Sequence, residues 1–256
     1  MVSPLAIEMR KAGEERGVMS GSAGMSGPTH EGRVRSAALS HSVMLDTADV
    51  EFIPAWISLQ EADALFSCLL ERLVLKQESI VIAGRTVLQP RLMLWMGDPD
   101  ATYRYSGRSF VPVAWDDRVI ELRSRVERAA RQRFNSVLIN LYRNGQDSMG
   151  YHADDEPELG PKPTIASFSL GATRRFLLKP RRKRSGFPRE FALTHGSLLI
   201  MRGTTQENFV HGVPKEPKVS GPRLNLTFRY VSRASVGQSA GTDSDERSTS
   251  GSIHQA

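Results

Sequence analysis

Gly150-Tyr151-His152-Ala153-Asp154-Asp155-Glu156 places an imidazole and a carboxylate two residues apart, at His152 and Asp154. In an extended chain, residues i and i+2 lie on the same face, so both side chains can reach one metal ion. A second imidazole from elsewhere would complete the two-histidine, one-carboxylate set that holds non-haem Fe(II) with open coordination positions. His-x-Asp also arises by chance, and the alternative interpretation is a histidine in a solvated loop.

A second stretch, Pro222–Tyr230, alternates polar and apolar residues without a break and therefore predicts a strand. Its polar face carries Arg223, Asn225, Thr227 and Arg229. In an ordinary antiparallel sheet that face would lie in water. Two arginines flanking short hydrogen-bonding residues suit an elongated dianion better, because a guanidinium binds a carboxylate through two parallel hydrogen bonds.

Two histidines compete to be the third metal ligand. His195 precedes Gly196-Ser197 at a predicted turn, where histidines are commonly exposed or capped. His211 lies within Asn208–Pro214, shortly before the arginine strand. The other histidines fall in the expected tails and are not candidates: His30, His41 and His254.

These stretches together resemble the AlkB family of Fe(II)- and 2-oxoglutarate-dependent dioxygenases. The similarity runs from about Leu88 to Tyr230 and is strongest to the branch that contains the human alkylation-repair homologues 2 and 3. The spacing between His211 and the arginine strand matches the family, so the resemblance favours His211 over His195. The segments that carry it are His152–Asp154, His211, Arg223–Arg229, Val137–Tyr142, Ile165–Gly171 and His195–Leu199.

The implied fold is mainly β with flanking helices, a double-stranded β-helix or jelly roll. We expect residues 46–233 to form the dioxygenase domain. Residues 1–45 and 234–256 are rich in Gly and Ser without sustained periodicity, so we expect disordered tails there.

The implied activity is oxidative demethylation of N-alkylated nucleobases such as N1-methyladenine and N3-methylcytosine in DNA. In this chemistry 2-oxoglutarate and O2 are co-substrates, Fe(II) is the cofactor, and the products include succinate, CO2 and, from a methyl group, formaldehyde. One alternative is the same dioxygenase chemistry on RNA, protein or a small molecule. Another is a non-enzymatic jelly roll that binds nucleic acid.

The family assigns its oxo-acid to polar residues on two strands. Asn140 and Tyr142 share one face of Val137–Tyr142 and would hydrogen-bond 2-oxoglutarate, since buried polar groups need partners. The remaining positions lie on the arginine strand, where Arg223 would reach the distal carboxylate: Arg223, Asn225, Thr227 and Arg229.

The resemblance also implies a site for the damaged base. Tyr103, Tyr105 and Ser106 would belong to a lid over the base, and aromatic faces attract a cationic methylated base by about 1–2 kcal/mol. Half-buried sheet packing is the other interpretation of the tyrosines. Asp155 and Glu156 would lie against the base, where a carboxylate favours a cationic lesion over a neutral base.

A predicted hairpin over Ser79–Pro90 bears on whether the protein prefers single-stranded or double-stranded nucleic acid. In the family member that prefers double strands, the corresponding turn carries an aromatic wedge that fills the gap left by a flipped base. Here the position is Ala83, and alanine cannot replace the lost stacking. We therefore expect a preference for single-stranded substrate.

Net charge and cysteine content indicate the kind of binding partner and the cellular compartment. Lys and Arg number 34 against 28 Asp and Glu, a formal charge of +6 that favours a polyanionic partner such as alkylated DNA or RNA. The single cysteine, Cys68, excludes an internal disulfide and fits a reducing compartment, so we expect a cytoplasmic protein, nucleoid-associated in a bacterium. No apolar run approaches the roughly 20 residues that span a membrane. We expect a monomer.

Two helices and one basic loop complete the predictions. Ser58–Glu61 is a capping box that opens a helix to about Lys76, and a second helix should run from Asp116 to Phe134. Lys179–Gly186 is strongly basic and is either solvated or in contact with phosphates.

Overall fold

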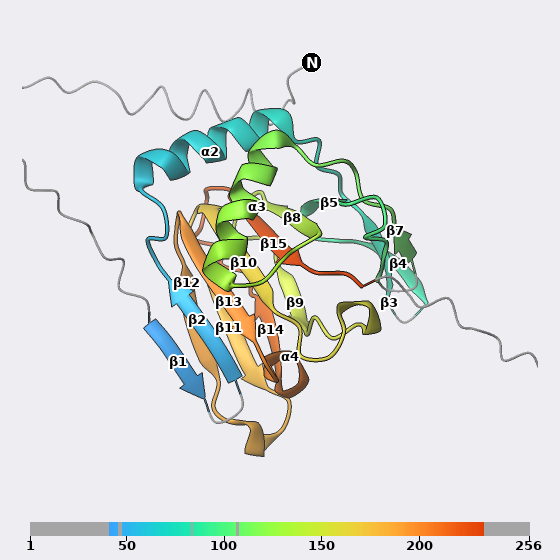
Figure 1. Cartoon of the computed structure of the whole chain (residues 1–256), viewed down its shortest axis with the longest axis vertical. Helices are drawn as coiled ribbons and strands as arrows, with labels where there is room; N and C mark the ends of the chain where they lie inside the picture. The colour runs from blue at the N-terminus through green and yellow to red at the C-terminus, as the bar shows by residue number, and fades with distance from the viewer. Residues whose placement is uncertain (1–40, 46–47, 83, 106–107, 233–256) are drawn as a thin grey trace, which may run out of the picture.

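The structure, a computed structural model, describes residues 41–45, 48–82, 84–105 and 108–232 (Figure 1). Two antiparallel sheets form its centre, which confirms the predicted double-stranded β-helix. The seven-stranded sheet has the order β1 (His41–Leu45), β2 (Ala48–Ile53), β13 (Ser197–Arg202), β10 (Ile165–Gly171), β15 (Arg223–Arg229), β8 (Ser136–Tyr142) and β5 (Leu92–Gly97). The four-stranded sheet has the order β12 (Arg189–Leu193), β11 (Arg174–Pro180), β14 (Phe209–Val213) and β9 (Met149–His152).

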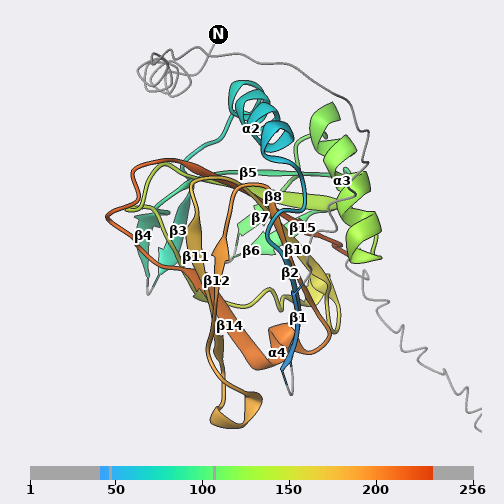
Figure 2. The same cartoon turned by 90° about the vertical axis from the view of Figure 1, so that its left-hand side faces the viewer.

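Helices α2 (Leu59–Arg72) and α3 (Asp117–Ala130) cover the outer face of the large sheet (Figure 2). Each begins at a side-chain cap, since Ser58 accepts a hydrogen bond from the Glu61 amide and Asp116 accepts one from the Arg118 amide. Their apolar faces pack on outward side chains of four strands. These side chains include Val137, Ile139, Ala166, Phe168, Leu198, Ile200, Leu224, Leu226 and Phe228.

A second core fills the space between the two sheets. Its buried side chains come from both sheets and their connections, and include Val50, Trp95, Ile165, Phe176, Leu178, Leu199, Met201, Phe209 and Val213. The strands of the large sheet are therefore apolar on the helix side, while their opposite face divides between this core and a set of polar residues. Burying each large apolar side chain stabilises the fold by about 1.5–3 kcal/mol.

Both helices end earlier than the sequence predicts. The helix expected to reach Lys76 ends at Arg72, because Leu73 adopts an extended conformation. Lys76 then exchanges backbone hydrogen bonds with Met93, at 3.0 and 2.7 Å. The helix expected to reach Phe134 ends at Ala130, and Arg131 takes a left-handed conformation with φ of 54°.

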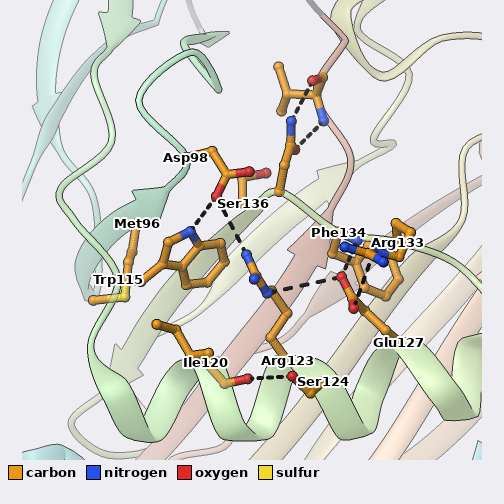
Figure 3. A network of polar contacts seen from close by, with 12 residues as sticks. Met96, Asp98, Trp115, Ile120, Arg123, Ser124, Glu127, Arg133, Phe134 and Ser136 are labelled. Carbon is orange, nitrogen blue, oxygen red and sulfur yellow. Dashed lines mark hydrogen bonds and ion pairs between the residues drawn. The ribbon is translucent and has the colours of Figure 1, made fainter.

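A polar network fixes α3 against the ends of β5 and β8 (Figure 3). Asp98 accepts hydrogen bonds from Trp115 Nε1 at 2.7 Å and from Arg123 Nη1 at 3.5 Å. The Arg123 guanidinium lies 4.5 Å from the centre of the Trp115 ring. Glu127 accepts from the Phe134 amide at 2.8 Å, so the network holds the connection from α3 to β8 in place.

The predicted hairpin is confirmed as β3 (Ser79–Ile82) and β4 (Arg85–Leu88), and a second hairpin pairs β6 (Tyr103–Tyr105) with β7 (Arg108–Phe110). Ala83 and Ser106 lie outside the described residues. The short helices are η1 (Pro157–Leu159), η2 (Lys183–Ser185) and α4 (Thr205–Asn208). Within the described ranges, no helix has the length and apolar character needed to cross a membrane.

Candidate active site

Strand pairing brings His152 and His211 together. β9 and β14 run antiparallel with His152 opposite His211, and the two ring centroids are 4.4 Å apart. Asp154 follows β9, and one donor atom from each of the three residues lies within 4.8 Å of the others. His195, the competing histidine, is engaged elsewhere: its Nδ1 accepts from the Gly171 amide at 2.7 Å.

Hydrogen bonding and burial orient the two histidines for metal binding. His152 Nδ1 lies 2.9 Å from the Gly150 carbonyl oxygen, which can only accept, so Nδ1 donates and Nε2 is the nitrogen left for a metal ion. Burial, reinforced by the positive charge that His152 can carry, lowers the pKa of His211 to about 3. His211 is therefore neutral at physiological pH, and its ring stacks on Phe176 at a centroid distance of 5.2 Å.

Asp154 supplies the negative charge. Burial alone would raise the pKa of its carboxyl group, but the positive charge of Arg229 and the nearby imidazoles outweigh burial and lower that pKa to about 2. Oδ1 accepts a hydrogen bond from Arg229 Nη2 at 2.7 Å. Oδ2 is buried without a hydrogen-bond partner among the described residues and lies 3.9 Å from His211 Nε2. One carboxylate oxygen is thus held by an arginine while the other faces the histidines.

The polar face of β15 forms the floor of an inner cavity between the sheets. Asn225 Nδ2 donates to Ser167 Oγ at 2.8 Å, and Thr227 Oγ1 donates to Asn225 Oδ1 at 3.0 Å. Arg223 is 1% exposed and donates from Nη2 to Ser169 Oγ at 2.9 Å. Its Nε and Nη1 are buried with no hydrogen-bond partner in the described part of the chain. Asn225 and Thr227 therefore shape the floor, whereas Arg223 has donors to spare for a ligand.

Burial also lowers the pKa of the Arg223 guanidinium to about 10. The group remains positively charged at neutral pH, and its carbon lies 5.1 Å from the centre of the Tyr142 ring. A desolvated cation with free donors is a binding site for an anion.

Two cavities meet at the His–Asp–His cluster. The inner one is narrow, about 30 Å³, and extends from the cluster to Arg223, Asn140 and Tyr142. The outer one, about 190 Å³, is largely apolar. Met149, His152, Asp154 and Arg229 line both cavities, so a metal ion held by the cluster would face each of them. The walls of the outer cavity include Met93, Trp95, Val111, Val113 and Leu138.

Residues 49–229 match the sequence profile of the 2OG-Fe(II) oxygenase superfamily. The chain belongs to this superfamily. Its curated relatives include "Alpha-ketoglutarate-dependent dioxygenase alkB homolog 3" of Homo sapiens, 41% identical over 186 residues, which cover 70% of this chain and 64% of the relative. "Alpha-ketoglutarate-dependent dioxygenase alkB homolog 3" of Bos taurus gives the same identity and coverage. "DNA oxidative demethylase ALKBH2" of Arabidopsis thaliana is 35% identical over 211 residues, 72% of this chain and 67% of the relative.

The chain thus spans somewhat less than two thirds of the length of the alkB homolog 3 proteins. The predicted resemblance is confirmed, and with it the Fe(II), 2-oxoglutarate and O2 that this dioxygenase family uses.

The structure says less about the residues predicted to contact a substrate base. Tyr103 and Tyr105 lie in β6, and Ser106 falls outside the described residues. The Asp155 carboxylate accepts from Arg181 Nη2 at 2.5 Å, and neither Asp155 nor Glu156 is among the residues that line the outer cavity. The substrate roles of all five stay predictions.

Three residues of the oxygenase site were missed by the sequence reasoning. Ser167 and Ser169 hold Asn225 and Arg223, and the signal was available, because both serines fall on one face of the strand Ile165–Gly171. Gln206 in α4 accepts from the Asp154 amide at 3.0 Å and is 1% exposed. Nothing in the local pattern of a four-residue helix marks Gln206.

Proposed function

We propose that this oxygenase removes alkyl groups oxidatively from N-alkylated nucleobases in DNA, such as N1-methyladenine and N3-methylcytosine, and favours single-stranded substrate. The observation that carries the proposal is the position of His152, Asp154 and His211 where an oxo-acid cavity and an outer cavity meet. The relatives named as DNA oxidative demethylases support the choice of substrate.

The donor set fits Fe(II). Two imidazoles and one ionised carboxylate form the two-histidine, one-carboxylate arrangement that leaves coordination positions open. Asp154 Oδ2, which has no hydrogen-bond partner among the described residues, and His152 Nε2 are the atoms that a metal ion would engage. At neutral pH no proton has to leave His211 or Asp154 before the ion binds, since the pKa values of both are far below 7.

The inner cavity offers the groups that 2-oxoglutarate needs, and we propose that this oxo-acid binds there. Arg223 offers Nε and Nη1 to the distal carboxylate in a bidentate pair. Asn140 and Tyr142 border the same cavity and would bind nearer the metal. Arg229 holds Asp154 in its ionised form and adds positive charge beside the cluster.

The outer cavity suits the alkylated base. Its apolar walls exclude water from the reacting carbon, while His152 and Asp154 open onto it from the metal side. We propose that Tyr103, Tyr105, Ser106, Asp155 and Glu156 complete this site when nucleic acid binds.

When bound, Fe(II) supplies the activation of O2 that couples decarboxylation of 2-oxoglutarate to oxidation of the alkyl carbon. The chain's own residues bind the oxo-acid through Arg223, keep Asp154 ionised through Arg229, and hold the base in a dry cavity. One oxygen atom of O2 enters succinate and the other enters the alkyl group, which then leaves as formaldehyde when it is methyl.

Nucleic acid binding has further support in the charge distribution. Arg182, Lys183 and Arg184 are exposed in the loop between β11 and β12, and the formal charge of the chain is +6. On the basis of this charge and the single cysteine we propose a cytoplasmic location, nucleoid-associated in a bacterium. We also propose that the protein acts as a monomer.

The test is formaldehyde release from matched oligonucleotides that carry one methylated base in single-stranded DNA, double-stranded DNA or RNA, with Fe(II), 2-oxoglutarate and O2. We expect the highest rate on single-stranded DNA. A higher rate on RNA would favour the RNA alternative. Succinate formation without repair of any oligonucleotide would mean that the substrate is of another class.

A further inference from the structure

Arg91 is a buried cation placed between the two cavities. It immediately precedes β5, is 3% exposed, and lines the outer cavity. Its Nε donates to Asn140 Oδ1 at 2.8 Å, and its Nη2 donates to Gln89 Oε1 at 2.5 Å. Nη1 lies 3.5 Å from the Ser148 carbonyl oxygen. Arg91 is thus held at three points while one of its partners, Asn140, borders the inner cavity.

The contact with Asn140 determines which end of the amide faces the inner cavity. A guanidinium only donates hydrogen bonds, so it selects the oxygen of the Asn140 amide and turns Nδ2 away from itself. Without that donor, the two orientations of a side-chain amide differ little in shape, and neither is strongly preferred. Asn140 is 1% exposed, so its orientation is set by protein contacts rather than by bulk water.

We propose that Arg91 is a positioning residue for 2-oxoglutarate binding, which it promotes by presenting Asn140 Nδ2 as a preoriented donor. The inference rests on the proposed oxo-acid site in the inner cavity. Arg91 acts through Asn140, and its cation is held by neutral acceptors, the Gln89 and Asn140 amides and a backbone carbonyl, so its charge also favours a nearby dianion.

The test is a binding measurement that needs no turnover. Calorimetric titration of 2-oxoglutarate into Mn(II)-loaded protein under anaerobic conditions would compare the wild type, Arg91→Met, Asn140→Ala and the double variant. We expect Arg91→Met to weaken 2-oxoglutarate affinity roughly tenfold, as other losses of a residue supporting a ligand do. In the Asn140→Ala background, the same substitution should change affinity less than about twofold, because the intermediary is gone.

Arg85→Met, on the exposed strand β4, is the matched control and should bind like the wild type. Equal effects of Arg91→Met in both backgrounds would overturn the proposal, as would unchanged affinity in the single variant. Wild-type protein that fails to bind 2-oxoglutarate would instead overturn the proposed function, so the two failures are distinguishable.

If Arg91→Met does not fold, Arg91→Lys keeps a donor and should retain much of the affinity. A crystal structure of the wild-type Mn(II) and 2-oxoglutarate complex gives an independent readout. Asn140 with Oδ1 on Arg91 and Nδ2 within hydrogen-bonding distance of the oxo-acid supports the proposal. An Asn140 side chain that has left Arg91 refutes it.

Discussion

Replacing Arg223 with methionine should change ligand binding and stability in opposite directions. In the absence of ligand, Arg223 is a buried cation with one hydrogen bond to Ser169 and two nitrogens without partners in the described residues. Methionine fills a similar volume without charge. The variant therefore separates what the guanidinium does for 2-oxoglutarate from what it costs the empty fold.

The expected change in the free energy of unfolding follows from the pKa of Arg223. Burial lowers the pKa of Arg223 from 12.5 to about 10, so the folded state disfavours the charged form by about 3 kcal/mol at any pH below both values. This value already includes the favourable contact with Tyr142, so only the lost hydrogen bond to Ser169, worth about 1 kcal/mol, is subtracted from it. The net gain is about 2 kcal/mol, which raises Tm by roughly 4–8 °C for a domain of this size.

The effect of Arg223→Met on 2-oxoglutarate binding is unfavourable. Removing one partner of a buried, hydrogen-bonded charge pair costs about 2–5 kcal/mol, which corresponds to a loss of 2-oxoglutarate affinity of roughly 30-fold to several thousand-fold. Titration calorimetry with the Mn(II)-loaded protein measures affinity, and thermal unfolding of the ligand-free protein measures stability.

Arg174 provides the matched control for the sign of the stability change. It is equally buried at 1% exposure, but Nε donates to Glu216 at 2.9 Å and the guanidinium also reaches three backbone carbonyls. Arg174→Met should therefore destabilise the fold by about 3–5 kcal/mol. Unchanged 2-oxoglutarate affinity in Arg223→Met, or a loss of stability as large as that of Arg174→Met, would refute the reasoning.

Three further predictions concern pH, packing and nucleic acid. The stability of the metal-free protein should fall by about 2 kcal/mol between pH 7 and pH 5, because the unfolded state takes up a proton at His211 that the folded state, with its pKa of about 3, does not; urea unfolding of His211→Asn should show a pH dependence smaller by that amount. Leu226→Ala should cost about 2–5 kcal/mol in urea unfolding, since Leu226 is fully buried, and a loss below about 1 kcal/mol would contradict the packing described. If Lys183 and Arg184 contact phosphates, replacing both with serine should reduce the slope of log Kd against log salt by about 1.4 for single-stranded DNA, and an unchanged slope would place the contact elsewhere.

The parts of the site that the sequence predicts well are those set by local geometry. His152 and Asp154, and likewise Arg223 and Asn225, are two residues apart, and alternation in an extended chain is enough to place each pair on one side. The structure puts both pairs around connected cavities. His211 required the spacing known from the family, because its meeting with His152 depends on the pairing of β9 with β14.

The sequence is less informative where contacts between distant segments override the local pattern. Leu73 continues the apolar spacing of α2, yet the chain leaves the helix there because Lys76 pairs with Met93 of β5. Asp155 follows a predicted metal ligand and is predicted to face a base; without nucleic acid its carboxylate pairs with Arg181, from just beyond β11, and its role toward a base stays a prediction. Neither partner can be read from the neighbouring sequence.

The most direct test of the central claim is whether demethylation depends on both the Fe(II) site and 2-oxoglutarate. The measurement is repaired base and succinate formed from single-stranded DNA that carries N1-methyladenine, with wild type and Asp154→Ala compared in the presence and absence of 2-oxoglutarate. The account predicts equal amounts of repaired base and succinate in the wild type, and neither product in Asp154→Ala, whose unfolding should remain cooperative. Repair that persists without 2-oxoglutarate, or in a folded Asp154→Ala, would contradict it.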